Sequence, residues 1–356
     1  MTNVKRMMMV AVLLTGFIAC KKDKDPVIII PPSGGAEKVT FNGIAGSEAG
    51  STAGNSVYLD LSGEKTSAVL RSGWDLGFYS GNDFRVILNN TTSAGAKVLA
   101  KYDLAAVTAA DTMGLSLAVS QMDPQSADLA FFDDINGDLS KTVIPAVSAT
   151  EASNPVIILN RGTGGGIASR PWIKLRVLRK GTGYTLQYAG ILETTFKTID
   201  VPKNADFNFQ FVSLENGIVP VEPEKTKWDI VWSYSVFETN FGDGQVPYNF
   251  SDLIAVNYLA GVQVKVKTYA DAATASTAYD AFNKDSIATN AVAAGRWTIG
   301  SGWRSTMPAT GAKQDRFYII KDANGNYYKF KCLAMGVGSD GGTRGKPDFK
   351  YTLIAQ

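Results

Sequence analysis

Apolar and polar residues alternate along several short segments of this chain. The clearest segment is residues 316–331, RFYIIKDANGNYYKFK, in which the alternation runs on both sides of Asn324-Gly325. An alternation of period two is typical of a strand with one buried face. Asn-Gly accepts the positive φ angles of a two-residue turn between paired strands. The pattern therefore predicts an antiparallel hairpin that turns at Asn324-Gly325.

A second pattern, Trp-Asp followed by alternating apolar residues, occurs twice. It reads GWDLGFYS at residues 73–80 and KWDIVWSY at residues 227–234. Period two predicts two sets of side chains that each share one face in a core: Trp74, Leu76 and Phe78, and Trp228, Ile230 and Trp232. Asp75 and Asp229 are then expected on the opposite faces, as turn or edge hydrogen-bonding groups and not as catalytic acids.

The Trp-Asp strands belong to a longer recurrence, at a spacing near 150 residues. Four features recur in the same order: a short strand, the Trp-Asp strand, a segment of small residues that leads into a strand, and a hairpin. Their positions are 57–63, 73–80, 94–98 and 172–190 in the first half, and 209–217, 227–234, 260–264 and 315–333 in the second. Aromatic alternations at 207–211 and 349–351 close the two series. This recurrence predicts an all-β protein with two tandem antiparallel β domains, residues 39–211 and 212–356.

Two Ala-rich inserts interrupt the β pattern. Residues 268–295 contain good helix formers and end at a Gly, which predicts a helix there. Residues 108–137 are the corresponding insert of the first half. We expect short helices and loops that cover one end of a sheet. Because these inserts repeat least between the halves, they are candidate carriers of function.

The N-terminal residues have the pattern of an export signal. Lys5 and Arg6 precede an apolar run of 13 residues, 7–19, whereas a bilayer span needs about 20. The end of the run, FIAC, resembles a bacterial lipobox, and the resemblance implies that Cys20 becomes the first mature residue and carries lipid. We therefore expect a signal peptide at 1–19, an anchor and linker at 20–38, and export through the secretory pathway to the outer membrane or cell surface. A plain cleaved signal with an incidental Cys is the alternative.

Composition and charge narrow the function. The chain of 356 residues has 35 basic and 33 acidic residues, which gives no reason to expect a nucleic acid partner. It contains no His, so neither a Ser-His-Asp arrangement nor a His metal site can form. If Cys20 is acylated, the only other Cys, Cys332, has no disulfide partner and is expected to be a buried structural thiol. These observations predict a protein that is not an enzyme.

Taken together, the lipobox at Cys20, the two Trp-Asp strands, the hairpin around Asn324-Gly325 and the closing residues 349–351 resemble the HmuY-like haem-binding lipoproteins. The resemblance covers residues 39–356 and rests on the order of the motifs. It implies an all-β fold, a membrane attachment through the lipid anchor alone, and haem or a porphyrin as ligand. It also implies host haemoproteins as the source of the haem and a TonB-dependent outer-membrane receptor as its acceptor. In this family the haem iron is held by two His or by Met.

Because His is absent, the resemblance leaves Met as the candidate haem-iron ligand. Four Met follow the signal: Met113, Met122, Met307 and Met335. Met307 is the leading candidate, because it lies in the loop segment GWRSTMPATG ahead of the second hairpin, and Met335 is the second. Trp303, Trp297 and Tyr279 are candidate walls of an apolar pocket. For each of these side chains, packing in a core is the alternative.

Two classes of function remain open at this point. One is capture of haem and its transfer to an outer-membrane receptor. The other is a surface lipoprotein whose duplicated β domain binds a glycan or a protein, or has a structural role.

The lipobox resemblance predicts that Cys20 carries the lipid. Metabolic labelling with a radioactive fatty acid should mark the intact chain and leave the Cys20→Ala variant unlabelled, because the thiol is the acylation site. Equal labelling of the two chains would show that Cys20 is not the anchor.

Overall fold

The computed structural model describes residues 31–356, of which Pro32–Gln356 form one compact unit. The signal peptide and Cys20 lie outside the described residues. The unit consists of antiparallel sheets, with one α-helix, α1 (Ala272–Ala281), and several 3-10 turns. The predicted all-β class with short helical inserts is confirmed. None of the helices in residues 31–356 has the length and hydropathy that crossing a bilayer requires.

Nine strands, β4 to β12, build what we call the first lobe. A five-stranded sheet has the order β10-β9-β8-β7-β6, and a four-stranded sheet has the order β12-β11-β4-β5. The strands are β4 (Leu76–Tyr79), β5 (Val86–Leu88), β6 (Gly95–Val98), β7 (Ile157–Asn160), β8 (Ile173–Lys180), β9 (Gly183–Gly190), β10 (Lys197–Val201), β11 (Phe209–Ser213) and β12 (Gly217–Val219).

The remaining strands build the second lobe. Its five-stranded sheet has the order β1-β20-β19-β18-β15, its four-stranded sheet has the order β14-β13-β2-β3, and β16 and β17 form a separate hairpin. The strands are β1 (Gly35–Thr40), β2 (Asn55–Asp60), β3 (Lys65–Leu70), β13 (Ile230–Asn240), β14 (Gln245–Val256), β15 (Gln263–Thr268), β16 (Arg304–Thr306), β17 (Ala309–Ala312), β18 (Arg316–Lys321), β19 (Tyr327–Ala334) and β20 (Asp348–Ala355).

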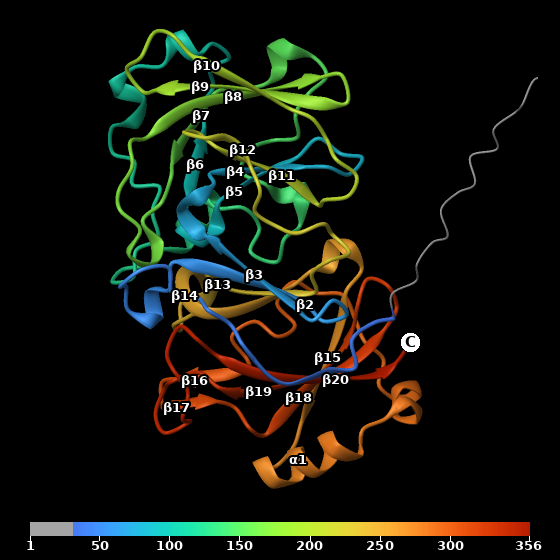
Figure 1. The fold of residues 1–356 in the computed structure, drawn as a ribbon. Coiled ribbons are helices and arrows are strands. Elements are labelled where there is room, and N and C mark those ends of the chain that lie inside the picture. The colour runs from blue at the N-terminus through green and yellow to red at the C-terminus, as the bar shows by residue number, and fades with distance from the viewer. Residues whose placement is uncertain (1–30) are drawn as a thin grey trace, which may run out of the picture. The chain divides into compact units, whose positions relative to one another are not determined.

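Each lobe packs its two sheets face to face around a core of its own. The core of the first lobe joins residues of β4 and β5 to residues of β6 to β9. The core of the second lobe joins β2, β13 and β14 to β15, β18, β19 and β20. The four sheets therefore lie in four layers, with the two four-stranded sheets in the middle (Figure 1). Burial of the apolar faces drives this stacking.

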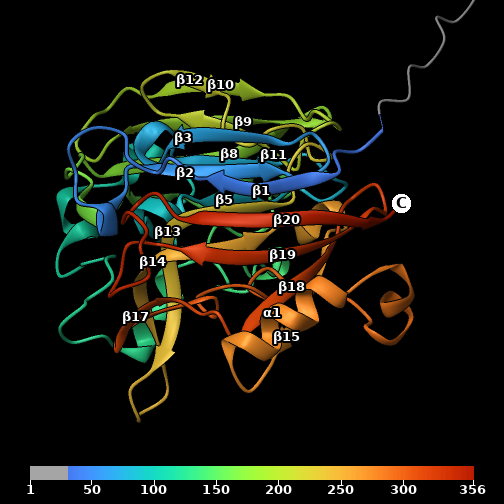
Figure 2. The ribbon, with the colours of Figure 1, turned by 60° about the horizontal axis from the view of Figure 1, so that its bottom comes forward.

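The strand pairing interleaves the two halves of the sequence. The N-terminal strands β1 to β3 belong to the second lobe, where β2 pairs with β13 and β1 pairs with β20 (Figure 2). The strands β11 and β12, which lie at the expected boundary, pair with β4 in the first lobe. The two lobes have the same strand order once β1–β3 are matched to β10–β12. Pairing thus runs across residue 211, and separate folding of 39–211 and 212–356 stays a prediction.

The expected hairpin at Asn324-Gly325 exists, but the expected two-residue turn is wrong. Lys321 pairs with Tyr327, so five residues connect β18 to β19. Only Gly325 of the Asn-Gly pair has a positive φ, 96°. The carboxylate of Asp322 accepts hydrogen bonds from the backbone N–H groups of residues 324 and 326, which stabilises the longer loop.

The predicted helix is present in the second insert, whereas the first insert contains only 3-10 turns. Residues 268–295 contain α1, and Asp271 caps it by accepting a hydrogen bond from the N–H of Thr274 at 2.7 Å. Tyr279 on this helix is buried edge-on against Phe317 of β18, at 5.5 Å between ring centroids, so it packs in a core. Residues 108–137 form only 3-10 turns, among them 109–112 and 126–131.

The two Trp-Asp junctions share one set of hydrogen bonds. Asp75 accepts from the N–H of Leu214 at 2.9 Å, and Asp229 accepts from the N–H of Leu61 at 2.8 Å. Both carboxyl groups are buried. The expectation that these Asp residues are hydrogen-bonding groups is therefore confirmed, and each of them ties its own strand to a hairpin distant in the sequence.

The electrostatic environments of the two junctions differ. Arg161 forms a bidentate pair with Asp75, at 2.8 and 2.9 Å, and Arg170 lies 3.2 Å away. Within residues 31–356, Asp229 has no such cation. Burial, with the nearby charges of Asp322 and Asp60, raises the pKa of Asp229 well above its ordinary value. The first junction is an ion pair, whereas the second holds a carboxyl that favours its neutral form.

Interleaved pairing predicts how fragments behave. Residues 71–222 hold all nine strands of the first lobe, so this fragment should fold alone, with a β-type circular dichroism spectrum and a cooperative thermal transition. Residues 212–356 lack β1–β3 and should need residues 31–70 in trans. Fragment 39–211 lacks most of β11–β12, so its folding requires β2–β3 to take that place. If 71–222 is unfolded while 39–211 and 212–356 both fold alone, the lobes are not folding units.

The junctions also predict opposite responses to the same substitution. Asp75→Asn removes the buried carboxylate shared by Arg161 and Arg170. Because Glu215 stays paired with Arg161, the free energy of unfolding should fall by about 3 kcal/mol, the low end for breaking a buried pair. Asp229→Asn should be neutral or stabilising at pH 8. The unfolded pKa of Asp is about 3.9. Because the folded pKa of Asp229 lies above it, stability falls as pH rises between the two values. Urea unfolding at pH 5 and pH 8 measures both effects. Equal destabilisation by the two variants would contradict the assignment.

Candidate functional site

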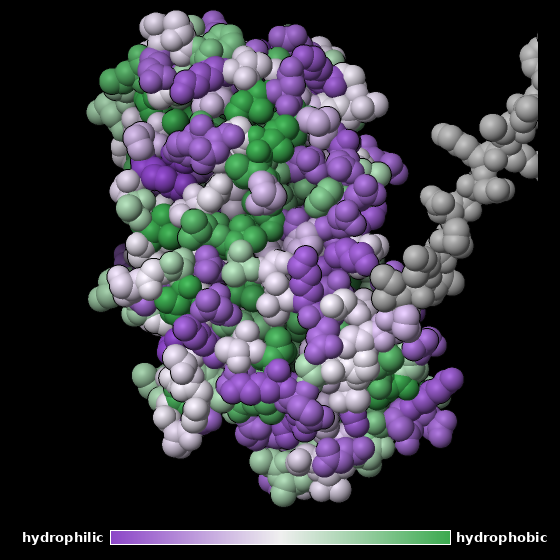
Figure 3. Space-filling view, viewed as in Figure 1, coloured by the Kyte–Doolittle hydropathy of each residue, from purple (hydrophilic) through white to green (hydrophobic). Residues whose placement is uncertain are grey.

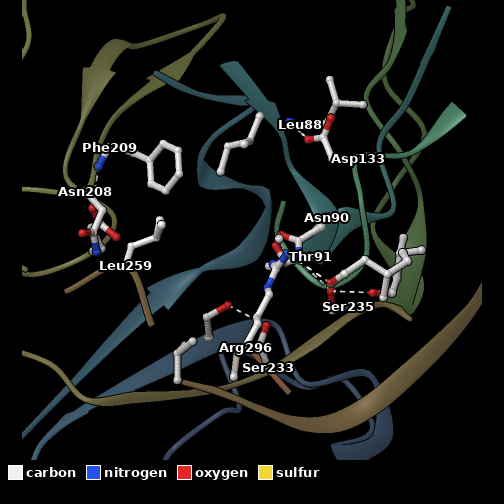
Figure 4. A pocket seen from close by; sticks show the side chains of 18 of the residues that line it. Leu88, Asn90, Thr91, Asp133, Asn208, Phe209, Ser233, Ser235, Leu259 and Arg296 are labelled. Carbon is white, nitrogen blue, oxygen red and sulfur yellow. Dashed lines mark hydrogen bonds between the residues drawn. The ribbon is translucent and has the colours of Figure 1, made fainter. Parts of the chain in front are cut away.

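A cavity of about 150 Å³ lies between the two four-stranded sheets. Residues of β2, β13 and β14 line one side, and residues of β5 and β11 line the other. Residues 132–135 and 137–139 and residues 296–297 also contribute to the wall. Figure 4 shows Ser233 and Arg296 on one side of this space, with Leu88 and Asp133 across from them.

Both repeated Trp residues face this cavity, which corrects the expectation that they share a core face with the apolar residues that follow them. Leu76 lies in the core of the first lobe, whereas Trp74 packs edge-on against Phe211, at 4.8 Å between ring centroids. Trp228 packs in the same way against Tyr58, at 5.1 Å. Side chains alternate only within a paired strand. β4 and β13 begin at residues 76 and 230, after the Trp-Asp pair, so the alternation does not extend back to the Trp.

Two carboxyl groups in the cavity wall, the buried Glu222 and the half-buried Asp133, accept hydrogen bonds from backbone N–H groups. Glu222 accepts a hydrogen bond from the N–H of Phe209 at 2.7 Å, and burial raises the pKa of its carboxyl to about 8. Asp133 accepts from the N–H groups of Leu88 and Val143, at 2.7 and 2.8 Å, yet burial raises its pKa to about 6. Each is held in place by backbone donors.

The described residues were compared with the clusters and thiols that metal and nucleophile chemistry use. Residues 31–356 contain no group of three or more Cys, Asp or Glu side chains placed to hold a metal ion. Cys332 is buried in the core of the second lobe, and burial raises the pKa of its thiol well above the ordinary value. This agrees with the expectation of a structural thiol, because a thiolate is disfavoured there.

The expected haem-binding residues lie in different environments. Met307 is 90% exposed, in the turn between β16 and β17. Met335 and Trp303 are fully buried in the core of the second lobe, and the Trp303 indole donates a hydrogen bond to the carbonyl of Asp252 at 2.8 Å. None of the three lines the cavity, whereas Trp297 does. Met307 and Met335 thus differ in exposure, and their roles as ligands stay predictions.

A chain of aromatic side chains runs along the β13–β14 hairpin. Successive rings meet edge to face at centroid distances of 5.3, 5.7, 5.3 and 5.3 Å, in the order Phe241, Tyr248, Phe250, Phe237 and Trp297. Phe241, at the tip, is 67% exposed. We call these five residues the aromatic ladder. It presents a partly exposed apolar surface beside the outer edge of the sheet.

Two loops that carry exposed Met dock on the edge of β14 next to this ladder. Gln121 accepts a hydrogen bond from the N–H of Asn249 at 2.9 Å, and Met122, the next residue, is 95% exposed. Arg304, three residues before Met307, donates to the carbonyl of Ser251. Asn249 and Ser251 are two residues apart, about 7 Å along the strand. The contact of each segment with β14 has no signal in the sequence, because no local pattern links residues so distant in the chain.

Comparison with known proteins gives one match. The sequence profile of the family described as HmuY protein matches residues 53–351 in a single stretch that covers strands of both lobes. No curated protein and no solved structure matches the chain.

Proposed function

The chain belongs to the HmuY family, a family of haem-binding proteins, and from this premise we propose that it captures haem or a related porphyrin at the cell surface. The observation that supports this function is the pair of exposed Met loops beside the aromatic ladder on β14. Thioethers are soft ligands that bind haem iron. Aromatic faces suit a flat apolar ring system.

The ligand set that we propose is Met122 and Met307, one from each loop. Both side chains are exposed and both loops are fastened to the same edge of β14. The side chain of Met335 is fully buried, so it would reach a ligand only if the core of the second lobe opened. Two thioethers favour ferrous over ferric iron, because the softer ion binds sulfur more strongly.

The porphyrin is proposed to lie on the β14 edge and not inside the cavity between the sheets. Pockets that enclose drug-sized ligands have volumes of roughly 300–1,000 Å³. The cavity, at about 150 Å³, is too small for a porphyrin. A site on an exposed edge is also open to a second protein, which suits both uptake from a haemoprotein and release to a receptor.

Location and partners complete the proposal. A lipid on Cys20 would hold the chain at the outer membrane, with the residues between Cys20 and β1 as the tether. Host haemoproteins are the proposed donors and a TonB-dependent receptor is the proposed acceptor.

A second function, binding of a glycan or a protein, is favoured by one observation. Large apolar side chains are exposed between β9 and the end of β12: Leu192 (74%), Phe196 (50%) and Ile218 (45%). The space-filling view shows hydrophobic residues at the surface of both lobes, among hydrophilic ones (Figure 3). Exposed apolar groups that gather in patches mark interaction sites. A haem titration separates the two functions.

The Met pair predicts the outcome of that titration. Haem added to residues 31–356 should give a saturable Soret change, with tighter binding after reduction by dithionite. Met122→Ala and Met307→Ala should each weaken binding by more than the roughly tenfold that loss of an outer-shell contact costs at metal sites. Met113→Ala, which removes another exposed Met, is the matched control. Met335→Ala should lower stability by about 2–5 kcal/mol and leave affinity unchanged.

Three results would each contradict a different part of this proposal: haem capture, the identity of the ligands, or ligation by thioethers. Absence of any saturable change in both redox states would exclude haem capture and favour the glycan or protein function. Unchanged binding by both Met122→Ala and Met307→Ala would leave haem capture standing and remove the proposed ligands. Tighter binding of ferric than of ferrous haem would exclude thioether ligation.

A further inference from the structure

The cavity between the four-stranded sheets has features that the haem proposal does not use. We propose that it is a separate binding site for a small, flat aromatic carboxylate. The proposal rests on the size of the cavity, on its aromatic walls and on two hydrogen-bond donors in the wall that lack adequate partners.

Size and shape limit the ligand to a single ring. A cavity of about 150 Å³ holds a molecule the size of benzene. The two edge-to-face pairs, Trp74 with Phe211 and Trp228 with Tyr58, contribute to opposite sides of the space. Each pair comes from one lobe, at equivalent positions of the two four-stranded sheets. A flat aromatic ring inserted between them can make edge and face contacts with both.

The indole of Trp228 supplies the first donor. Trp228 is 8% exposed, and its Nε1–H is buried with no acceptor among residues 31–356. A buried Trp N–H normally has a partner, because an unpaired buried donor loses its hydrogen bond to water without replacement. Trp228 lines the cavity, so an acceptor atom on a bound molecule can supply this partner.

The guanidinium of Arg296 supplies the second donor group and the charge. Within the described chain its one hydrogen bond is a long one, 3.5 Å to the carbonyl of Ile135, and that oxygen already accepts from Trp297 at 2.6 Å. No carboxylate of the described residues lies within ion-pair distance of Arg296. A guanidinium binds a carboxylate through two parallel hydrogen bonds, so a carboxylate is the acceptor that satisfies it best.

Each of the four carboxyl groups in the wall already accepts a hydrogen bond from the chain: Asp133, Asp134, Asp138 and Glu222. Asp133 is engaged by the N–H groups of Leu88 and Val143, and Glu222 is engaged by that of Phe209. Because burial raises the pKa of Glu222 to about 8, this group is mostly uncharged at pH 7 and repels an anion little. Arg296 and Trp297 line the cavity and are half-buried, so both side chains are accessible to solvent.

The test uses benzoate as the probe, with benzamide, toluene and benzylamine as comparators, on residues 31–356. Titration calorimetry and Trp fluorescence should show benzoate binding about tenfold or more tightly than toluene and benzylamine, because only benzoate satisfies Arg296. Arg296→Gln should remove the preference for benzoate over benzamide. Trp228→Phe should weaken benzoate and benzamide and leave toluene unchanged. Trp232→Phe is the matched control, since its indole N–H also lacks a partner but lies in the core of the second lobe.

The comparators decide the proposal even if a variant fails to fold. Equal binding of toluene and benzoate would overturn it, since the cavity would then be a purely apolar one. No binding of any probe, or preferred binding of benzylamine, would overturn it as well. Met122→Ala and Met307→Ala should leave benzoate binding unchanged, so failure of the haem proposal and failure of this one give different results.

Discussion

Two buried carboxyl groups hold together strands that are far apart in the sequence. Asp75 accepts the N–H of Leu214, and Asp229 accepts that of Leu61, so each Trp-Asp strand is fastened to a hairpin that precedes the other one. This arrangement determines both four-stranded sheets and therefore both walls of the space between the lobes. It also makes the N-terminal strands part of the second lobe, with β1 closing the sheet against β20. The lobes are consequently joined by chain connectivity as well as by packing.

The same geometry is stabilised by different electrostatics in the two lobes. At the first junction, two Arg side chains compensate the buried charge of Asp75. At the second junction, no cation among residues 31–356 pairs with Asp229. Desolvation therefore raises the pKa of its carboxyl and favours the neutral form. A charged and a neutral carboxyl can accept the same backbone hydrogen bond, so the strand geometry survives the difference. The two lobes are nevertheless expected to respond differently to pH and to substitution.

The proposed haem site lies where the repeated framework is least regular. The long β13–β14 hairpin has no equivalent length in the first lobe, where β4 and β5 have four and three residues. Its outer edge receives the loops of Met122 and Met307, and its rings form the aromatic ladder. The cavity between the sheets is instead built from equivalent positions of both lobes, through Trp74 and Trp228. The edge site proposed for a large flat ligand and the cavity proposed for a small one therefore use different parts of the fold.

The sequence by itself determined the β class, the recurrence of the Trp-Asp strands, the hairpin near Gly325 and the helix around Tyr279, because each depends on neighbours in the chain. It did not determine which hairpin pairs with which strand, since both hairpins fit both strands. It misplaced Trp74 and Trp228, because alternation holds only inside a paired strand and the pairing begins after them. The contacts that place the segments of Met122 and Met307 on β14 were likewise decided by tertiary structure alone. Each loop is positioned by a hydrogen bond to β14, a contact across more than fifty residues that no local pattern records.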